Sequence, residues 1–180
     1  LEGALRYLLE RWEPDLIVVG GDLTNLGTPE EMEAVRGLLA QVQTPLFPLF
    51  GNHDGANERR IQLAREGKAD QTFTRHYERC FGPPFYSFDW GGRHFVMQMD
   101  FDRCFSPADQ ARKANWLEAD LGRQPPGREI IVVLHGPPAA DFIQQLSRFE
   151  VSTVLYGHRH SSKVCRHHGI DLICTPAFCF

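Results

Sequence analysis

The sequence lacks the features that mark several classes of protein. No apolar run approaches the length of a membrane span, and no internal repeat or low-complexity tract is visible. The 19 basic residues are outnumbered by 23 acidic ones and form no stripe, so there is no strong nucleic-acid signal. No secretory signal peptide is visible. The compartment stays open between cytoplasm and export, and so does the oligomeric state.

Cysteine motifs of the zinc-ribbon or redox type are also missing. The five cysteines form no CxxC pair, and their odd number fits reduced thiols. One disulfide remains as an alternative. Cys165 and Cys174 flank a short predicted hairpin and would face each other across it, close enough to bridge.

The chain is long enough to form one hydrophobic core. The 180 residues are 42% hydrophobic and carry a formal charge of −4, which fits one domain over residues 1–180. Leu1 opens in the middle of a helical pattern, and the chain stops at Phe180 without an obvious terminator. We therefore expect the domain to be incomplete at its N-terminus, and at its C-terminus as well.

Helical and strand patterns alternate along the chain, which is typical of an α/β fold. Thr28 and Glu31 form a capping box before one helix, and Ser106 caps another. Gly91-Gly92 predicts a tight hairpin, and the polar segment from Gly55 to Asp70 predicts a loop with a short helix. The apolar run at 15–20 predicts a strand packed on both faces. In full, helices are expected at 1–12, 29–41, 73–81, 107–122 and 139–149, and strands at 15–20, 45–50, 85–90, 93–100, 129–134, 151–156, 163–167 and 170–175.

Four of these strands are followed by metal-ligand side chains. They are Asp22, then Asn52 with His53 and Asp54, then His135, then His158 and His160. The carboxyl ends of parallel strands meet at one edge of a sheet, so residues far apart in sequence would converge there. Each signal alone has an ordinary reading as a turn residue or a structural histidine, but the set together favours a site for Mn, Fe or Zn. The remaining histidines, His76, His94, His167 and His168, are predicted to lie outside it.

These motifs resemble the calcineurin-like metallophosphoesterase superfamily. The resemblance is carried by Gly20-Gly21-Asp22, Gly51-Asn52-His53-Asp54, His135-Gly136-Pro137-Pro138 and Gly157-His158-Arg159-His160. More weakly, residues 85–89, 94–100 and 116–117 look like its cyclic-nucleotide-phosphodiesterase-like and purple-acid-phosphatase-like branches. The resemblance implies a four-layered α/β sandwich with two mixed β-sheets flanked by helices.

The resemblance also implies a role for each site residue. Asp22 would bridge two metal ions. The remaining protein ligands of one ion would be Asn52, His135 and His158, and His160 would bind the other ion. His53 would protonate the leaving oxygen, and Asp54 would orient His53. The implied reaction is hydrolysis of a phosphodiester or phosphomonoester by a metal-activated hydroxide, with a small phosphorylated substrate.

One departure from the family pattern limits this expectation. The family's first strand and its Asp-x-His motif do not precede Asp22. We expect two divalent or trivalent ions (Mn, Fe or Zn) in a longer protein, with one or none held well by this chain, which would then be inactive or weak. Two alternatives stay open: a phosphomonoesterase, protein phosphatase or nuclease, and a non-enzymatic binding or scaffold module on the same fold.

Overall fold

A computed structural model describes residues 1–55, 72–100 and 106–177 of the chain. Its elements are α1 (Glu2–Trp12), β1 (Ile17–Val19), α2 (Pro29–Leu39), β2 (Leu46–Pro48), the 3₁₀ turn η1 (Asn52–Asp54), α4 (Thr72–Phe81), β3 (Phe85–Trp90), β4 (Arg93–Gln98), α5 (Pro107–Gly122), β5 (Ile130–Val133), α6 (Ala140–Leu146), β6 (Val151–Tyr156), β7 (Lys163–His167) and β8 (Ile170–Cys174). The loop expected from Gly55 to Asp70 lies, beyond Gly55, outside the described residues. No helix in the described ranges is long and apolar enough to cross a membrane.

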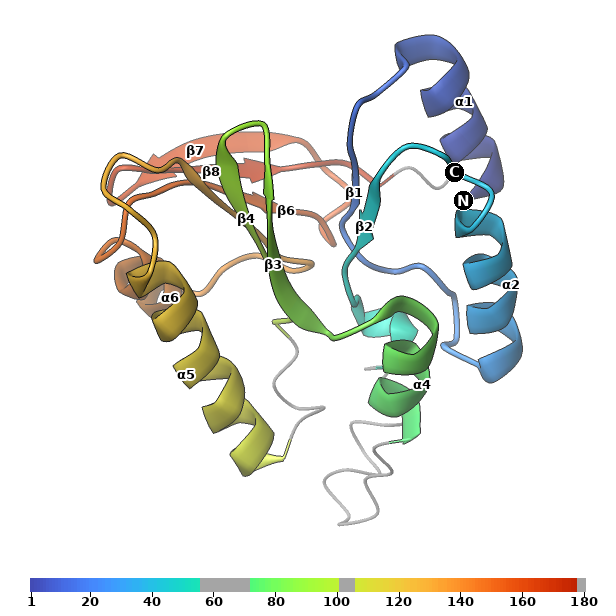
Figure 1. Ribbon diagram of the computed structural model, residues 1–180, viewed down its shortest axis with the longest axis horizontal. Helices are drawn as coiled ribbons and strands as arrows, with labels where there is room; N and C mark the ends of the chain where they lie inside the picture. The colour runs from blue at the N-terminus through green and yellow to red at the C-terminus, as the bar shows by residue number, and fades with distance from the viewer. Residues whose placement is uncertain (56–71, 101–105, 178–180) are drawn as a thin grey trace.

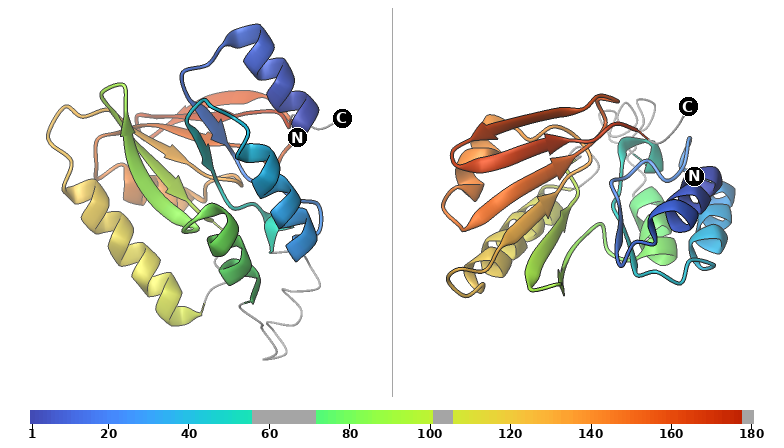
Figure 2. Two further views of the ribbon diagram at one scale, coloured as in Figure 1. Left: turned by 45° about the vertical axis from the view of Figure 1, so that its right-hand side comes forward. Right: turned by 90° about the horizontal axis from the view of Figure 1, so that it is seen from above.

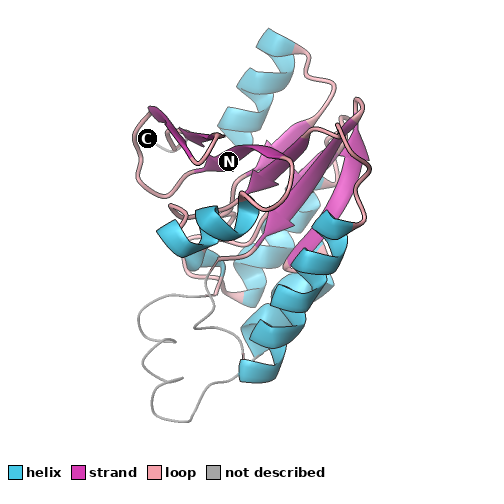
Figure 3. Ribbon diagram, turned by 90° about the vertical axis from the view of Figure 1, so that its left-hand side faces the viewer, coloured by secondary structure: helices cyan, strands magenta, loops and turns pink. Residues whose placement is uncertain are grey.

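The elements stack in four layers, as the resemblance implied (Figures 1 and 2). Helices α5 and α6 cover one face of a six-stranded sheet, and the two-stranded sheet of β1 and β2 faces the other. Helices α2 and α4 cover the outer face of β1 and β2. Figure 3 shows the strands enclosed between helices on both sides. The predicted α/β sandwich with two helix-flanked sheets is therefore confirmed.

The two sheets differ in strand direction. In the larger one the order is β3-β4-β5-β6-β8-β7, with parallel pairs from β4 to β8 and an antiparallel hairpin at each edge. Within the described residues the smaller sheet is the parallel pair β1 and β2, so only the larger sheet is mixed, whereas both were expected to be. Consecutive parallel strands bring their carboxyl ends to one edge, which is the arrangement that a site built from strand ends requires.

Each core is built from side chains that alternate along a strand. In β1, Val18 packs against the cluster between the sheets, and Val19 packs against the cluster beneath α2 and α4. The predicted packing of this strand on both faces thus holds, although the strand has only three residues. Between the sheets, the rings of Phe47 and Phe88 stack with centroids 3.6 Å apart.

Local sequence signals set the ends of several elements. The Thr28 side chain accepts from the Glu31 N–H while Glu31 accepts from the Thr28 N–H, which closes the predicted capping box of α2. Gly91 and Gly92 have φ of 56° and 80°, as a two-residue hairpin turn requires. These turn residues fix the register in which Trp90 pairs with Arg93.

The alternative disulfide between Cys165 and Cys174 is not formed. Both thiols are free, and Cys165 lies opposite Leu172 while Cys174 lies opposite Lys163. The two-residue turn between β7 and β8 pairs His167 with Ile170, and this register places the cysteines two positions out of alignment. The register therefore excludes the predicted contact.

His94 lies outside the predicted site, as expected, but it has a structural role. It is 5% exposed, and its Nδ1 lies 2.8 Å from Asp89 Oδ1 while its Nε2 lies 2.9 Å from Asp120 Oδ2. Ser87 donates to the other oxygen of Asp120. The imidazole thus joins the β3–β4 hairpin to α5 through Asp120, while Asp89 holds the ring from within the hairpin.

We expect His94→Ala to destabilise the chain by about 3 kcal/mol, because it leaves the partly buried Asp120 without its ring partner. Urea unfolding followed by circular dichroism measures this change. The exposed His167→Ala serves as control and should stay within about 0.5 kcal/mol of the parent. A loss below about 1 kcal/mol for His94→Ala would show that the network contributes little.

Candidate metal centre

Four strand ends meet at one edge of the molecule. Asp22 follows β1, Asn52 opens η1 after β2, His135 follows β5, and His158 follows β6. The ladder between β5 and β6 continues past both strands, since Gly157 N–H donates to the carbonyl of His135 at 2.9 Å. This extension holds the His135 and His158 backbones side by side.

The predicted side chains converge on one nitrogen of His135. Its Nε2 lies 3.0 Å from Asn52 Oδ1, 3.2 Å from His158 Nδ1 and 3.3 Å from Asp22 Oδ2. On the other side of the ring, Nδ1 lies 2.7 Å from the Gly20 carbonyl, which can only accept. Nδ1 therefore carries the proton in the neutral ring, and Nε2 keeps its lone pair for the cluster.

This donor set fits a divalent cation. A metal bound at about 2.1 Å by tetrahedral or octahedral ligands sets neighbouring ligand atoms about 3.0–3.4 Å apart, which is the range of distances around Nε2. A proton on Nε2 would satisfy one neighbouring lone pair at a time, whereas a cation would satisfy all four atoms. Asp22, His135 and His158 are also close enough to share one ion, with ligand atoms within 4.8 Å of one another.

Protonation in the cluster follows from burial and charge. Burial alone would raise the pKa of Asp22, but the hydrogen bond and charge of His135 hold it below its usual value. Burial works against a charge on His135, yet Asp22 holds the pKa of that ring above its usual value. Burial and the neighbouring His135 lower the pKa of His158. The cluster therefore keeps a carboxylate and a neutral His158 ready to bind a cation.

The backbone is strained at the same positions. Among the described residues, five other than glycine have positive φ, and three of them are the predicted ligands Asp22, His158 and His160, at 54°, 64° and 50°. Left-handed backbone costs a residue with a Cβ about 1–2 kcal/mol, less for aspartate. Such strain often accompanies functional sites, where the surrounding structure holds it in place.

Two glycines of the motifs are required by close approach. A Cβ on Gly21, whose φ is 96°, would lie 2.5 Å from His135 Nδ1, and one on Gly51 would overlap the backbone of Asp22. Only glycine lets the β1 and β2 loops come this close. The glycines that precede Asp22 and Asn52 therefore serve the convergence of the ligands directly.

The expected contact between Asp54 and His53 is not formed. Asp54 is fully buried and accepts hydrogen bonds from the N–H groups of Gly51, Leu23 and Thr24 and from the Thr24 hydroxyl. Burial raises its pKa, and these donors oppose the rise. His53 is exposed, and its Nδ1 lies 2.7 Å from the Asn25 carbonyl. The ring is thus oriented by Asn25, while Asp54 ties the η1 loop to the loop after β1.

His160 lies outside the three-ligand group. Its side chain is exposed, and the group of mutually close ligand atoms at the strand ends contains Asp22, His135 and His158. The structure therefore brings together four of the five predicted metal ligands. His76, His94, His167 and His168 do not join them.

Asp100 also lies in this region, although no role was predicted for it. It follows β4, and its Oδ2 accepts from the Gly136 N–H at 2.7 Å. Burial raises the pKa of this carboxyl, and its Oδ1 has no hydrogen-bond partner within the part of the chain that the structure describes. A carboxylate directly after a strand was the signal that identified Asp22, and it could have identified Asp100.

Comparison with known proteins agrees with this geometry. A family model described as calcineurin-like phosphoesterase matches residues 1–174. A 3',5'-cyclic-nucleotide phosphodiesterase of Nostoc is 25% identical over 94% of this chain and 65% of its own length. A cAMP/cGMP dual specificity phosphodiesterase of Mycobacterium tuberculosis is 26% identical over 93% of this chain and 55% of its own. The chain thus spans about half to two thirds of the length of these relatives.

Solved structures share the fold at low sequence identity. The phosphopantetheinyl hydrolase of Mycobacterium tuberculosis matches with a TM-score of 0.58 at 14% identity, over 89% of this chain and 79% of that one. GAP50, the anchor in the inner membrane complex of Plasmodium, matches with a TM-score of 0.61 at 15% identity, over 97% and 65%. At this identity the likeness concerns the fold alone.

Proposed function

Because the chain belongs to the calcineurin-like phosphoesterase family, we propose that its strand-end cluster serves metal-dependent hydrolysis of small phosphate esters. The observation that carries the proposal is the convergence of Asn52, His158 and Asp22 within 3.3 Å of His135 Nε2. A cation of the Mn, Fe or Zn type bound there would supply Lewis-acid activation of water and phosphate. The similarity to cyclic-nucleotide phosphodiesterases favours a small phosphodiester as substrate.

The residues around the cluster would hold the site in shape. Asp22 uses both oxygens, since Oδ1 accepts from the His53 N–H at 2.9 Å and Oδ2 faces His135. Through the first contact it ties the η1 loop to the ligand cluster. Asp22 would therefore act as a ligand and as a positioning group for the residue that meets the leaving group.

His53 is our candidate for the proton donor. Nδ1 of the exposed ring donates to the Asn25 carbonyl. The other ring nitrogen, Nε2, is therefore the one that would donate a proton to the leaving oxygen of a bound ester. Protonation of a leaving oxygen by a positioned histidine contributes about 10²–10⁴-fold to rate. Asp54 would contribute by fixing the loop that carries His53 and Asn52.

A second cation would use Asp22 and His160. Two side chains are too few to hold an ion tightly, whereas four surround the first position. The chain is thus proposed to bind one cation well and a second weakly.

The test is metal loading followed by a turnover assay. The chain is treated with chelator, reloaded with Mn²⁺, Zn²⁺ or Fe²⁺, and analysed for metal content and for hydrolysis of bis(p-nitrophenyl) phosphate and p-nitrophenyl phosphate. We expect about one tightly held Mn²⁺ per chain, metal-dependent turnover, weak for this chain, and a preference for the diester. Two tightly held Mn²⁺ ions per chain would contradict the assignment of the second position, and metal binding without turnover of either ester would favour a binding module instead.

A further inference from the structure

A second group of metal-ligand side chains lies on the outer helices. Glu33 of α2 and His76 and Cys80 of α4 each offer a ligand atom, and these atoms lie within 4.8 Å of one another. His76 and Cys80 are four positions apart, so one face of α4 presents both toward α2. None of these residues belongs to the strand-end cluster.

One ring nitrogen of His76 is buried without a hydrogen-bond partner among the described residues. The Arg79 guanidinium lies 2.9 Å from Nδ1 and can only donate, so the neutral ring carries its proton on Nε2. Nε2 is buried and has no hydrogen-bond partner among the described residues. A buried polar atom in this position is unfavourable unless something binds it.

The other two ligands already interact. The Cys80 Sγ lies 3.7 Å from Glu33 Oε1, and Glu33 also pairs with Arg36 at 2.7 Å. Burial, followed by the charge of Glu33, raises the pKa of the Cys80 thiol. At neutral pH the cluster therefore holds a protonated thiol next to a carboxylate.

We propose that Glu33, His76 and Cys80 form a separate site for a thiophilic divalent cation of the zinc class. Cysteine, histidine and carboxylate are the ligands that Zn²⁺ takes in proteins, and three of them leave a fourth position for water. On binding, the Cys80 thiol releases its proton to solvent, the ring proton of His76 moves to Nδ1, and the exposed Arg79 turns into solvent. No group is oxidised or reduced, and one proton is released to solvent for each ion bound.

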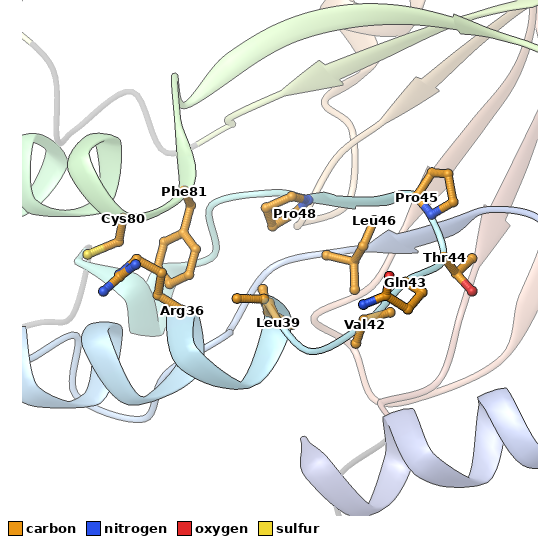
Figure 4. A pocket seen from close by; sticks show the side chains of 11 residues that line it. Arg36, Leu39, Val42, Gln43, Thr44, Pro45, Leu46, Pro48, Cys80 and Phe81 are labelled. Atoms are coloured by element: carbon orange, nitrogen blue, oxygen red, sulfur yellow. The ribbon is translucent and has the colours of Figure 1, made fainter.

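Cys80 also lines one end of a groove of about 460 Å³ between α2, β2 and α4. Figure 4 shows Cys80 and Arg36 pointing toward each other at that end, next to Phe81. In the same helix, Tyr77 contacts Phe50, the residue before the Gly51 loop, with ring centroids 4.9 Å apart. A cation here would cross-link α2 to α4 on the side of the fold that supports this loop.

Titration with Co²⁺ tests the proposal, because a thiolate bound to Co²⁺ gives a sulfur-to-cobalt charge-transfer absorption in the near ultraviolet. The strand-end cluster contains no sulfur, so this absorption does not depend on that site or on turnover. We expect the absorption to saturate at the intensity of one thiolate-bound Co²⁺ per chain and to be removed by Zn²⁺. The affinity should rise about tenfold per pH unit near neutrality, because one proton is released.

Matched variants define the ligands. Cys80→Ser should abolish the absorption, while Cys165→Ser, which removes another partly buried thiol, should keep it. Glu33→Gln, at an exposed position, should weaken binding at least tenfold, and Arg36→Gln should strengthen it several-fold by removing the competing partner of Glu33. Absence of the absorption from the parent chain, or its survival in Cys80→Ser, would overturn the proposal.

Discussion

His135→Ala is expected to abolish metal-dependent ester hydrolysis. The substitution removes the nitrogen on which Asn52, His158 and Asp22 converge, and with it the hydrogen bond to the Gly20 carbonyl. Even residues that only support a metal ligand change metal affinity or activity 10–100-fold, so loss of the central ligand should lower cation affinity by about 100-fold or more. Isothermal titration with Mn²⁺ and the diester assay measure the two effects.

The burial of His135 calls for a second variant. The side chain is 3% exposed, so its loss could also disturb folding. Asn52→Ala removes one oxygen from the same cluster at a less buried position, and it should reduce turnover in the same way while leaving the unfolding midpoint nearly unchanged. The exposed His167→Ala is the control and should keep normal turnover. Normal turnover in Asn52→Ala or His135→Ala would show that the site is wrongly assigned.

Local signals explain why much of this fold could be predicted from the sequence. Helix α5 begins after its Ser106 cap and ends at Gly122, and β6 covers Val151–Tyr156, both as expected. The convergence of Asp22, Asn52, His135 and His158 was also predictable, because parallel strands order their carboxyl ends along one edge. These features depend on periodicity, caps and a simple rule of topology.

Contacts between distant elements could not be predicted in the same way. Asp54 was expected to orient its sequence neighbour His53, but three of the four hydrogen bonds it accepts come from Leu23 and Thr24, about 30 positions away in the loop after β1. The separation of Cys165 from Cys174 depends on a register that a shift of two residues would have changed. The Glu33–His76–Cys80 group exists only because α2 packs beside α4. Each of these depends on tertiary packing, about which neighbouring residues carry little information.

Asp54→Ala is expected to have the largest effect on stability. The carboxylate accepts three backbone N–H groups and the Thr24 hydroxyl at 2.8–3.2 Å, in a fully buried position. Each hydrogen bond to a charged group contributes about 1.5–3 kcal/mol to stability, and in the variant the donors would stay buried without an acceptor. These losses are not additive, so we expect a destabilisation of about 3–5 kcal/mol in urea unfolding. The exposed Asp15→Ala is the control and should change stability by less than about 0.5 kcal/mol.

Asp54→Asn separates this positioning role from a direct action on His53. The amide keeps one oxygen but points an NH₂ group at donors, so stability and cation affinity should both fall because the loop that carries Asn52 is released. The pH dependence of the remaining turnover should keep its shape, since the His53 ring contacts the Asn25 carbonyl instead. A variant with unchanged stability and a displaced pH profile would mean that Asp54 acts through the ring of His53 after all.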